Sequence, residues 1–292
     1  MDGFRLKNII NIVDLVVISY LLDTLFLSFF IRELGAWLQP ILFRLITLVG
    51  IATIIYHDKK YPSRFSRFLR YFYPVVLISY IYGETASINH IFFTNSFDNI
   101  LSHLEYSFFG FQPSMEFSAK FPQLWFSELM NFSYFSYYLF TAGFAMAAYF
   151  LRKEDSVKIL YIIINSFLFY YTIFIIFPSE GPQYFLLQSP EETHGFFASL
   201  VSLAQKIGEA PTGAFPSSHV GMMVIFSWIS AKYFPRILAL VLLVSILICF
   251  ATVYIKAHYA IDVIAGIISA PIILFLANKF YKISQTILEE KF

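Results

Sequence analysis

Eight long apolar segments run along the chain, separated by shorter polar links. They cover Ile9–Ile31, Ala36–Tyr56, Tyr71–Phe92, Leu124–Leu151, Ile159–Phe177, Ala214–Phe234, Ile237–Ile255 and Ala257–Phe280. Because a helix rises about 1.5 Å per residue, each segment is near the length that crosses the roughly 30 Å hydrocarbon layer of a bilayer. The pattern predicts an all-α protein, a polytopic membrane helix bundle with about eight transmembrane helices.

Composition agrees with a membrane protein. Of the 292 residues, 58% are hydrophobic and 13% are charged, and the mean hydropathy is +0.68. Soluble domains carry about 25% charged residues. A net charge of +1 gives no reason to expect a nucleic acid partner. The single cysteine, Cys249, lies in an apolar segment, so neither a disulfide nor a cysteine-based metal site is expected.

Basic residues alternate from link to link and predict an orientation. One set of links and termini holds most of them: Arg5, Lys7, Lys59, Lys60, Arg64, Arg67, Arg70, Arg152, Lys153, Lys158, Lys232, Arg236, Lys279, Lys282 and Lys291. The other set holds Arg32, Lys120, Lys206 and Lys256. Basic residues gather on the cytoplasmic side of membrane proteins, so both termini are expected to be cytoplasmic.

Two links on the opposite, outer side are long. Residues 94–122 are rich in Phe, Ser and Asn and predict an interfacial amphipathic helix, and residues 179–213 form the second long link. Long loops in compact bundles are often functional. The chain is divided into residues 1–70, two N-terminal helices with a basic link, and residues 71–292, a six-helix core.

Three ionisable side chains are expected to meet at this outer face. The stretch "GAFPSSHVGMM" places His219 at the outer end of the sixth segment, and "YIKAHYAIDVIAG" places His258 and Asp262 at the outer start of the eighth. On a helix, the spacing of four residues puts His258 and Asp262 on one face, one turn apart.

This set of residue types permits phosphoryl transfer through a phosphohistidine. Asp262 would fix the tautomer of His258 and stabilise its charged form, which makes His258 a nucleophile. His219 would protonate a leaving oxygen. Ser217 and Ser218, with the free N–H groups of a helix start, would bind an anion. The chemistry needs no metal and no cofactor.

Simpler readings of the same residues stay open. Ser217 could be only a helix cap, His219 could be structural, and His258 with Asp262 could be only a local hydrogen bond. Together at one membrane face, however, these ionisable groups favour a functional site.

The two motifs resemble those of a known family. "FPSSHVG" and "HYAIDVIAG" are similar to the second and third motifs of the type 2 phosphatidic acid phosphatase superfamily. The resemblance implies that His258 is the nucleophile, Asp262 its partner, His219 the acid and later the base, and Ser217 a phosphate ligand. It also implies a six-helix core over roughly residues 70–280.

A narrower resemblance concerns one branch of that superfamily. "FFGFQPS" and "NFSYFSYYLF" resemble the branch that includes inositol phosphorylceramide synthase, and sphingomyelin synthase is similar in its His, His, Asp triad. Such enzymes transfer the phosphorylated head group of a lipid, and the phosphate of their donor lipid is a diester.

The basic residues of the superfamily's other motifs are missing here. Gly181-Pro182 stands where the resemblance implies Arg-Pro, and Ala251-Thr252 stands where it implies Ser-Arg. Gln183, Tyr184 and Lys256 are the nearby candidates for substitute substrate contacts, although Lys256 could instead extend to the interface.

The missing charges favour a phosphodiester substrate. A phosphomonoester carries nearly two charges and calls for Arg or Lys, whereas a diester carries one. We therefore expect a phosphotransferase that acts in the membrane on a phospholipid donor and a ceramide- or diacylglycerol-type lipid alcohol acceptor. A lipid phosphate phosphatase with the same triad stays open, and so does a non-enzymatic transporter or channel, although the latter predicts polar groups near the bilayer midplane.

Three further charged residues fall inside predicted spans: Arg44, Glu84 and Glu128. A charge in a span needs a partner, so internal ion pairs are expected for them rather than substrate contacts.

Overall fold

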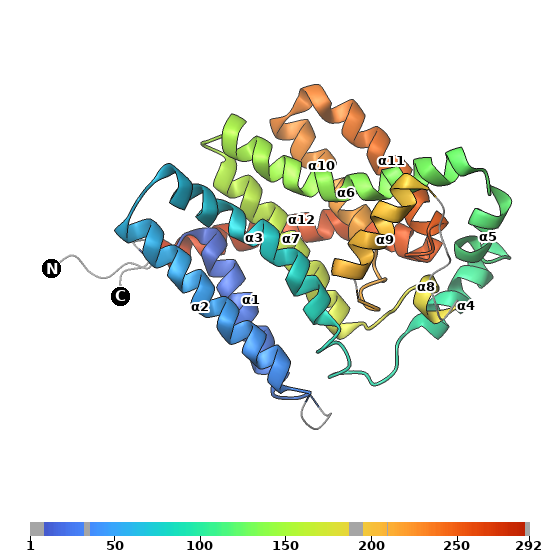
Figure 1. Cartoon of the computed structure of the whole chain (residues 1–292), viewed down its shortest axis with the longest axis horizontal. Helices are drawn as coiled ribbons and strands as arrows, with labels where there is room; N and C mark the ends of the chain where they lie inside the picture. The colour runs from blue at the N-terminus through green and yellow to red at the C-terminus, as the bar shows by residue number, and fades with distance from the viewer. Residues whose placement is uncertain (1–8, 32–35, 187–194, 209, 290–292) are drawn as a thin grey trace.

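The computed structural model describes residues 9–31, 36–186, 195–208 and 210–289, which contain helices and no strand (Figure 1). The helices are α1 (Ile12–Ser28), α2 (Leu38–Lys60), α3 (Arg64–Thr85), α4 (Asp98–Phe109), α5 (Pro113–Lys120), α6 (Leu124–Leu151), α7 (Ser156–Ile176), α8 (Pro182–Phe185), α9 (Phe196–Gly208), α10 (Ser218–Tyr233), the 3-10 turn η2 (Pro235–Ile237), α11 (Leu238–Tyr254) and α12 (Ala260–Glu289). Each of the eight predicted segments overlaps a long helix, and the all-α fold class is confirmed for these residues.

Four of the described helices are long and apolar enough to cross a membrane. They are α2, α7, α12 and the run Pro235–Tyr254 that contains α11. At 17 and 16 residues, α1 and α10 are shorter than a full span, and α3 and α6 carry more polar side chains. The chain is an integral membrane protein, while eight crossings stay a prediction.

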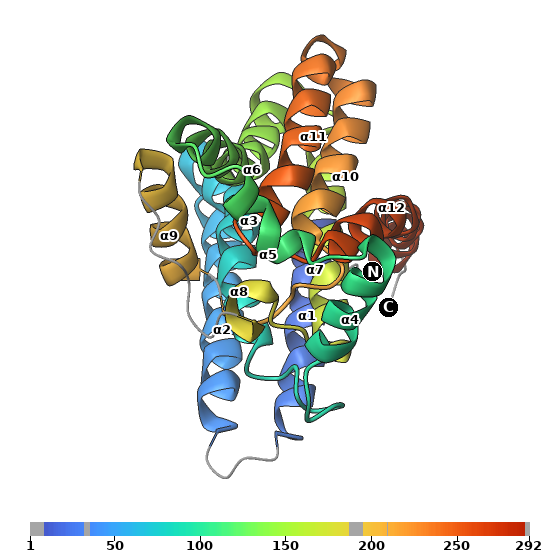
Figure 2. The same cartoon turned by 90° about the vertical axis from the view of Figure 1, so that its right-hand side faces the viewer.

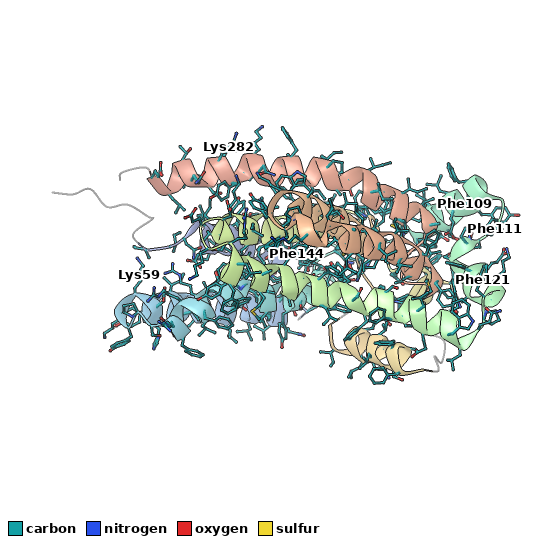
Figure 3. All side chains as sticks on the ribbon, turned by 90° about the horizontal axis from the view of Figure 1, so that it is seen from above. Lys59, Phe109, Phe111, Phe121, Phe144 and Lys282 are labelled. Carbon is teal, nitrogen blue, oxygen red and sulfur yellow. The ribbon has the colours of Figure 1, made fainter. Side chains whose placement is uncertain are left out.

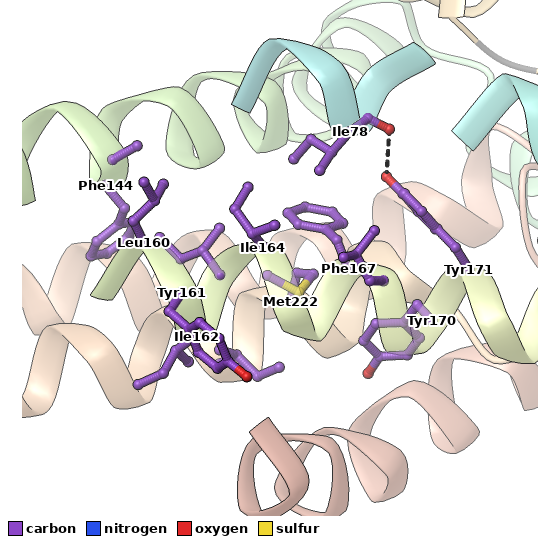
Figure 4. Packing of buried hydrophobic residues seen from close by; sticks show 14 of the residues in the cluster. Ile78, Phe144, Leu160, Tyr161, Ile162, Ile164, Phe167, Tyr170, Tyr171 and Met222 are labelled. Atoms are coloured by element: carbon purple, nitrogen blue, oxygen red, sulfur yellow. Dashed lines mark hydrogen bonds between the residues drawn. The ribbon is translucent and has the colours of Figure 1, made fainter. Parts of the chain in front are cut away.

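Helix α7 forms the centre of the bundle. Fifteen of its 21 residues are buried, and it packs against α1, α3, α6, α10 and α12. A helix that is apolar on all sides is typical of a buried core position. Figure 4 shows this packing, in which Phe167 and Met222 lie among the buried residues, and the hydroxyl of Tyr171 donates to the carbonyl of Ile78 at 3.1 Å.

The two ends of the bundle differ in character. Lys59 and Lys282 lie at one end, and Phe109, Phe111 and Phe121 lie at the other (Figure 3). The aromatic end carries α4 and α5, in the link for which an interfacial helix is predicted. Of the bases used to predict orientation, Arg5, Lys7, Arg32 and Lys291 lie outside the described residues.

The predicted ion pair between charged residues of two spans is confirmed for Arg44 and Glu84. Their side chains lie 3.5 Å apart, and Arg44 is almost fully buried. Glu128 is different: its carboxylate accepts hydrogen bonds from the backbone N–H groups of Phe197 and Ala198 at 3.0 and 3.1 Å. It therefore satisfies free donors at the first turn of α9, and among the residues that the structure describes it forms no ion pair.

Two glycines allow α10 and α12 to approach closely. A Cβ on Gly266 of α12 would lie 2.6 Å from the carbonyl oxygen of Ser217, and a Cβ on Gly221 of α10 would lie 3.2 Å from the carbonyl oxygen of Gly266. Small residues let helix backbones come together in membrane bundles. This contact brings the starts of the two helices, and the motifs beside them, to one place.

Candidate functional site

Two imidazoles face each other where α10 and α12 begin. Nδ1 of His219, in the first turn of α10, lies 3.2 Å from Nε2 of His258. The ring centroids are 5.4 Å apart. Both side chains are more than nine-tenths buried. The structure thus brings together the two histidines that the sequence placed at one membrane face.

The other ring nitrogen of His258 contacts a backbone carbonyl. Its Nδ1 lies 2.7 Å from the carbonyl oxygen of Ala214. A carbonyl only accepts, so Nδ1 carries the proton in this arrangement. In the neutral ring, Nε2 is then the nitrogen with the lone pair, and it accepts from Nδ1–H of His219.

Asp262 lies farther from His258 than the sequence suggests. Its Oδ2 is 3.8 Å from Nδ1 of His258, which is an ionic contact rather than a hydrogen bond. The reason is that α12 begins at Ala260 and not at Ala257, so His258 precedes the helix. The predicted one-turn spacing on a helix face is therefore wrong, and the carbonyl of Ala214 takes the tautomer-fixing position expected for Asp262.

Asp262 instead links the two motifs. Its Oδ2 accepts from the backbone N–H of Tyr259 at 2.8 Å, and its carbonyl accepts from the backbone N–H of Ser217 at 3.0 Å. The side chain is fully buried. The carboxylate therefore holds the turn that carries His258, while its backbone holds the turn that precedes His219.

Tyrosines of α6 surround His219. The ring of Tyr134 stacks on it with centroids 4.7 Å apart and planes at 28°, and the ring of Tyr137 lies at 4.3 Å. These tyrosines are not among the predicted site residues. Their signal was the cluster of tyrosines in "NFSYFSYYLF", but nothing in that cluster indicates which ring faces a histidine.

The two serines of the first motif lie at the start of α10. Ser217 is the N-cap, and its Oγ accepts from the N–H of Val220 at 3.4 Å. Ser218 is the first residue of the helix, and both side chains are buried. This placement favours the capping role of Ser217.

A small pocket opens onto both imidazoles. Beside His219 and His258 its lining includes Tyr82, Tyr134, Glu180, Gln183 and Tyr184. Of the substitute contacts that the sequence suggested, Gln183 and Tyr184 therefore line the pocket, whereas Lys256 does not. The lysine is 4% exposed, and its carbonyl accepts from the N–H of Gln183 at 2.9 Å.

The described lining of the pocket carries an acidic and no strongly basic side chain. Among the described residues that line it there is one acidic side chain, Glu180, and no Lys or Arg. Burial raises the pKa of the Glu180 carboxyl above its ordinary value, and the charge of Asp98 raises it further against a smaller lowering by His90. Among the described lining residues there is thus no Lys or Arg that could clamp a phosphate.

Comparison with known proteins identifies the family. The model of the PAP2 superfamily matches residues 100–276, more than half of the chain, including both histidine motifs. A "PA-phosphatase related-family protein" from Dictyostelium discoideum is 25% identical over 183 residues, which are 53% of this chain and 32% of that protein. The chain thus aligns with about a third of the length of this relative. No solved structure matches the chain. The narrower resemblance to lipid head-group transferases stays a prediction, but the chain belongs to the PAP2 superfamily.

Proposed function

We propose that the chain is an integral membrane phosphotransferase that moves a phospho-head group from a phospholipid to a lipid alcohol through a phosphohistidine on His258. The observation that carries the proposal is the pair of contacts on the His258 ring. Nδ1 donates to Ala214 at 2.7 Å, and Nε2 faces His219 at 3.2 Å inside a pocket. The nitrogen with a lone pair is therefore the one that points toward a proton donor.

In the first half-reaction, Nε2 of His258 attacks the phosphorus of the donor lipid. The N–P bond forms as the bond from phosphorus to the glycerol oxygen breaks. His219 acts in its doubly protonated, charged form: it gives one proton to that oxygen and becomes neutral, and diacylglycerol leaves. Asp262 stabilises the positive charge that develops on His258, from 3.8 Å.

In the second half-reaction, the neutral His219 takes the proton of the acceptor hydroxyl. The hydroxyl oxygen attacks phosphorus, the N–P bond breaks, and His258 returns to its starting state. Since a phosphoryl group does not fit between nitrogens 3.2 Å apart, substrate binding must separate the two rings. The ring of His219 would then rotate between the rings of Tyr134 and Tyr137.

The pocket lining supports a diester donor over a monoester. A dianionic monoester would face Glu180 without a Lys or Arg among the described lining residues. A diester carries one negative charge, which backbone N–H groups and the side chains of Gln183 and Tyr184 are able to bind.

A second candidate is a lipid phosphate phosphatase that uses the same residues and water in the second step. Membership of the PAP2 superfamily and the printed name of the Dictyostelium discoideum relative favour it. Family membership also supports an enzyme over a channel or transporter. In either enzyme we place the site on the outer or lumenal face and both termini in the cytoplasm, as the basic links predict.

The experiment uses the purified chain in nanodiscs with phospholipids labelled in the phosphate, with and without ceramide or labelled diacylglycerol. An acceptor-dependent labelled lipid supports the phosphotransferase. Release of inorganic phosphate from phosphatidate, without any acceptor product, supports the phosphatase and contradicts the transferase. The His258→Ala variant provides the control for both products.

A further inference from the structure

Helix α4 presents acidic side chains to the site from outside the pocket. Asp98, Leu101 and Glu105 share its buried face, as their spacing of three and four residues requires. Ile100, Leu104 and Phe108 of the same helix are exposed apolar side chains. Figure 2 shows α4, α5 and α8 in front of the bundle at this end.

Asp98 binds the turn that leads into α8. Its Oδ1 accepts from the N–H of Gly181 at 2.8 Å, and its Oδ2 accepts from the N–H of Glu180 at 2.7 Å. This turn packs on the segment that carries His258, because a Cβ on Gly181 would lie 2.7 Å from the carbonyl oxygen of Ala257. Asp98 therefore fixes the wall of the pocket that contains Glu180 and Gln183.

Glu105 binds the start of α12. Its Oε1 accepts from the N–H of Ala260 at 2.6 Å, and its Oε2 accepts from the hydroxyl of Ser114 at 2.6 Å. Ala260 is the first residue of α12, two positions after His258 and two before Asp262. Glu105 therefore fixes the backbone between the proposed nucleophile and its carboxylate partner.

Anchoring α4 to the bundle does not by itself explain these carboxylates. Asp98 and Glu105 are both 0% exposed, and burying a carboxylate is costly unless strong hydrogen bonds satisfy it. An apolar side chain would bury the same face without that cost. Charge-assisted bonds to backbone N–H groups add direction, which apolar contacts lack.

We propose that Asp98 and Glu105 are positioning residues for phosphoryl transfer: from one helix they hold two adjoining backbone segments at the catalytic pocket, the turn with Glu180 and Gly181 and the segment that follows His258. The inference rests on the proposed function. Neither carboxylate lines the pocket, and each acts through the backbone that it binds. Loss of either set of bonds lets the walls of the pocket shift relative to Nε2 of His258.

The test exploits a difference between the two carboxylates. Asp98 accepts from two backbone N–H groups, so Asp98→Asn loses one of these bonds because an amide nitrogen does not accept. Glu105 accepts from the backbone N–H of Ala260 and from the hydroxyl of Ser114, so Glu105→Gln is able to accept from Ala260 and donate to the Ser114 hydroxyl, whereas Glu105→Ala loses both of these bonds. Displacement of catalytic groups by about 1 Å lowers rates by up to about 100-fold. We therefore expect about 10- to 100-fold lower kcat for Asp98→Asn and Glu105→Ala, and recovery of most of that loss in Glu105→Gln.

The measurements are kcat and KM for the phospholipid donor in nanodiscs, together with the Tm of each variant. The inference predicts a fall in kcat while KM for the donor and Tm change little. Glu116→Gln, which removes an exposed carboxylate from neighbouring α5, is the matched control and keeps wild-type kcat. Ser114→Ala, which removes only the hydroxyl bonded to Glu105, provides a milder test if a larger change prevents folding.

Two results overturn the inference. One is wild-type kcat in folded Asp98→Asn and Ser114→Ala proteins. The other is a fall in kcat for Glu105→Gln equal to that for Glu105→Ala, because the hydrogen bonds that Gln keeps would then have no effect on the rate. A wild-type chain without activity on any lipid phosphate overturns the proposed function and this inference with it, whereas fully active variants overturn this inference alone.

Discussion

His258 and His219 form a directed pair: Nε2 of His258 lies 3.2 Å from Nδ1 of His219. Since Nδ1 of His258 donates to the carbonyl of Ala214, the direction of proton donation between the rings runs from His219 to His258. In the proposed reaction, His219 therefore has to take up a second proton before it protonates the leaving oxygen, because a neutral imidazole does not release its N–H proton near neutral pH. In the same proposal, the contact covers the lone pair of His258 until substrate separates the rings.

Replacement of His219 by Asn tests its role as the acid. The amide nitrogen of Asn is able to occupy the place of Nδ1 and donate to His258, but it does not release its proton. Because general acid catalysis contributes about 10²- to 10⁴-fold, we expect kcat for the natural donor to fall by about that factor. A phosphodiester with a nitrophenol leaving group needs less protonation and should lose much less. Equal losses on both substrates would contradict the acid role.

Tyr134 is predicted to orient His219 through its ring. Stacked aromatic pairs contribute about 0.5–1.5 kcal/mol, so Tyr134→Ala should lower kcat by about 2- to 10-fold. Tyr134→Phe keeps the ring and should be clearly more active than Tyr134→Ala. Steady-state kinetics of the two variants, with Tm as the check on folding, provide the measurement. A Phe variant as slow as the Ala variant would show that the hydroxyl matters instead.

The contact between α10 and α12 should not tolerate a methyl group at Gly266. A Cβ there would lie 2.6 Å from the carbonyl oxygen of Ser217, whose N–H binds the carbonyl of Asp262. Overpacking of a close contact destabilises by about 1–3 kcal/mol, so Gly266→Ala should lower both Tm and kcat. Gly143 lies in α6 with nothing within 4 Å of a built Cβ, and Gly143→Ala should keep or raise Tm. Equal changes in Tm and kcat for Gly266→Ala and Gly143→Ala would contradict the close contact at Gly266.

Stability should depend on pH through Glu105. Burial raises the pKa of its carboxyl above the ordinary value, and the bonds from Ser114 and Ala260 lower it by less. Between the unfolded and the raised folded pKa, the folded protein binds more protons than the unfolded chain. The free energy of unfolding therefore falls as pH rises through this window.

Comparison with Glu105→Gln isolates this contribution. As pH rises above the pKa that Glu105 has in the unfolded chain, the Tm of the wild type should fall relative to the Tm of the variant. Below that pKa, the difference between the two Tm values should no longer change with pH. Thermal unfolding in detergent across that range provides the measurement. A wild type that gains Tm relative to the variant as pH rises would reverse the sign and contradict the burial argument.

Local pattern was sufficient to predict the positions of the long helices and the meeting of the two motifs, but not α8 and α9 in the second long link. The apolar segments overlap the long helices because the length and apolar composition of a segment indicate a membrane helix without knowledge of its neighbours. His219 and His258 meet because the helix starts beside which they lie are at the same end of the bundle. The start of α12 was missed because Lys256 adopts a left-handed φ of 64°, which non-glycine residues rarely do. The chain therefore turns after α11, and His258 stays outside the helix.

The supporting residues could not be predicted for a different reason. Asp98, Glu105 and Tyr134 reach the site from α4 and α6, and their contacts depend on how these helices pack against α8 and α12. An acidic residue on an amphipathic helix is most often solvated, so the sequence alone gives Glu105 no reason to bind Ala260 of α12. Only the packed structure shows that both carboxylates are buried.

The most direct test of the account is to trap the intermediate. The chain in nanodiscs is mixed for one turnover with a phospholipid labelled in its phosphate, without an acceptor, and quenched in base, which preserves phosphohistidine. We expect an acid-labile label on His258. The label should be absent in His258→Ala and should disappear from the wild type when lipid alcohol is added. Turnover without any labelled protein, or a label on another residue, would contradict it.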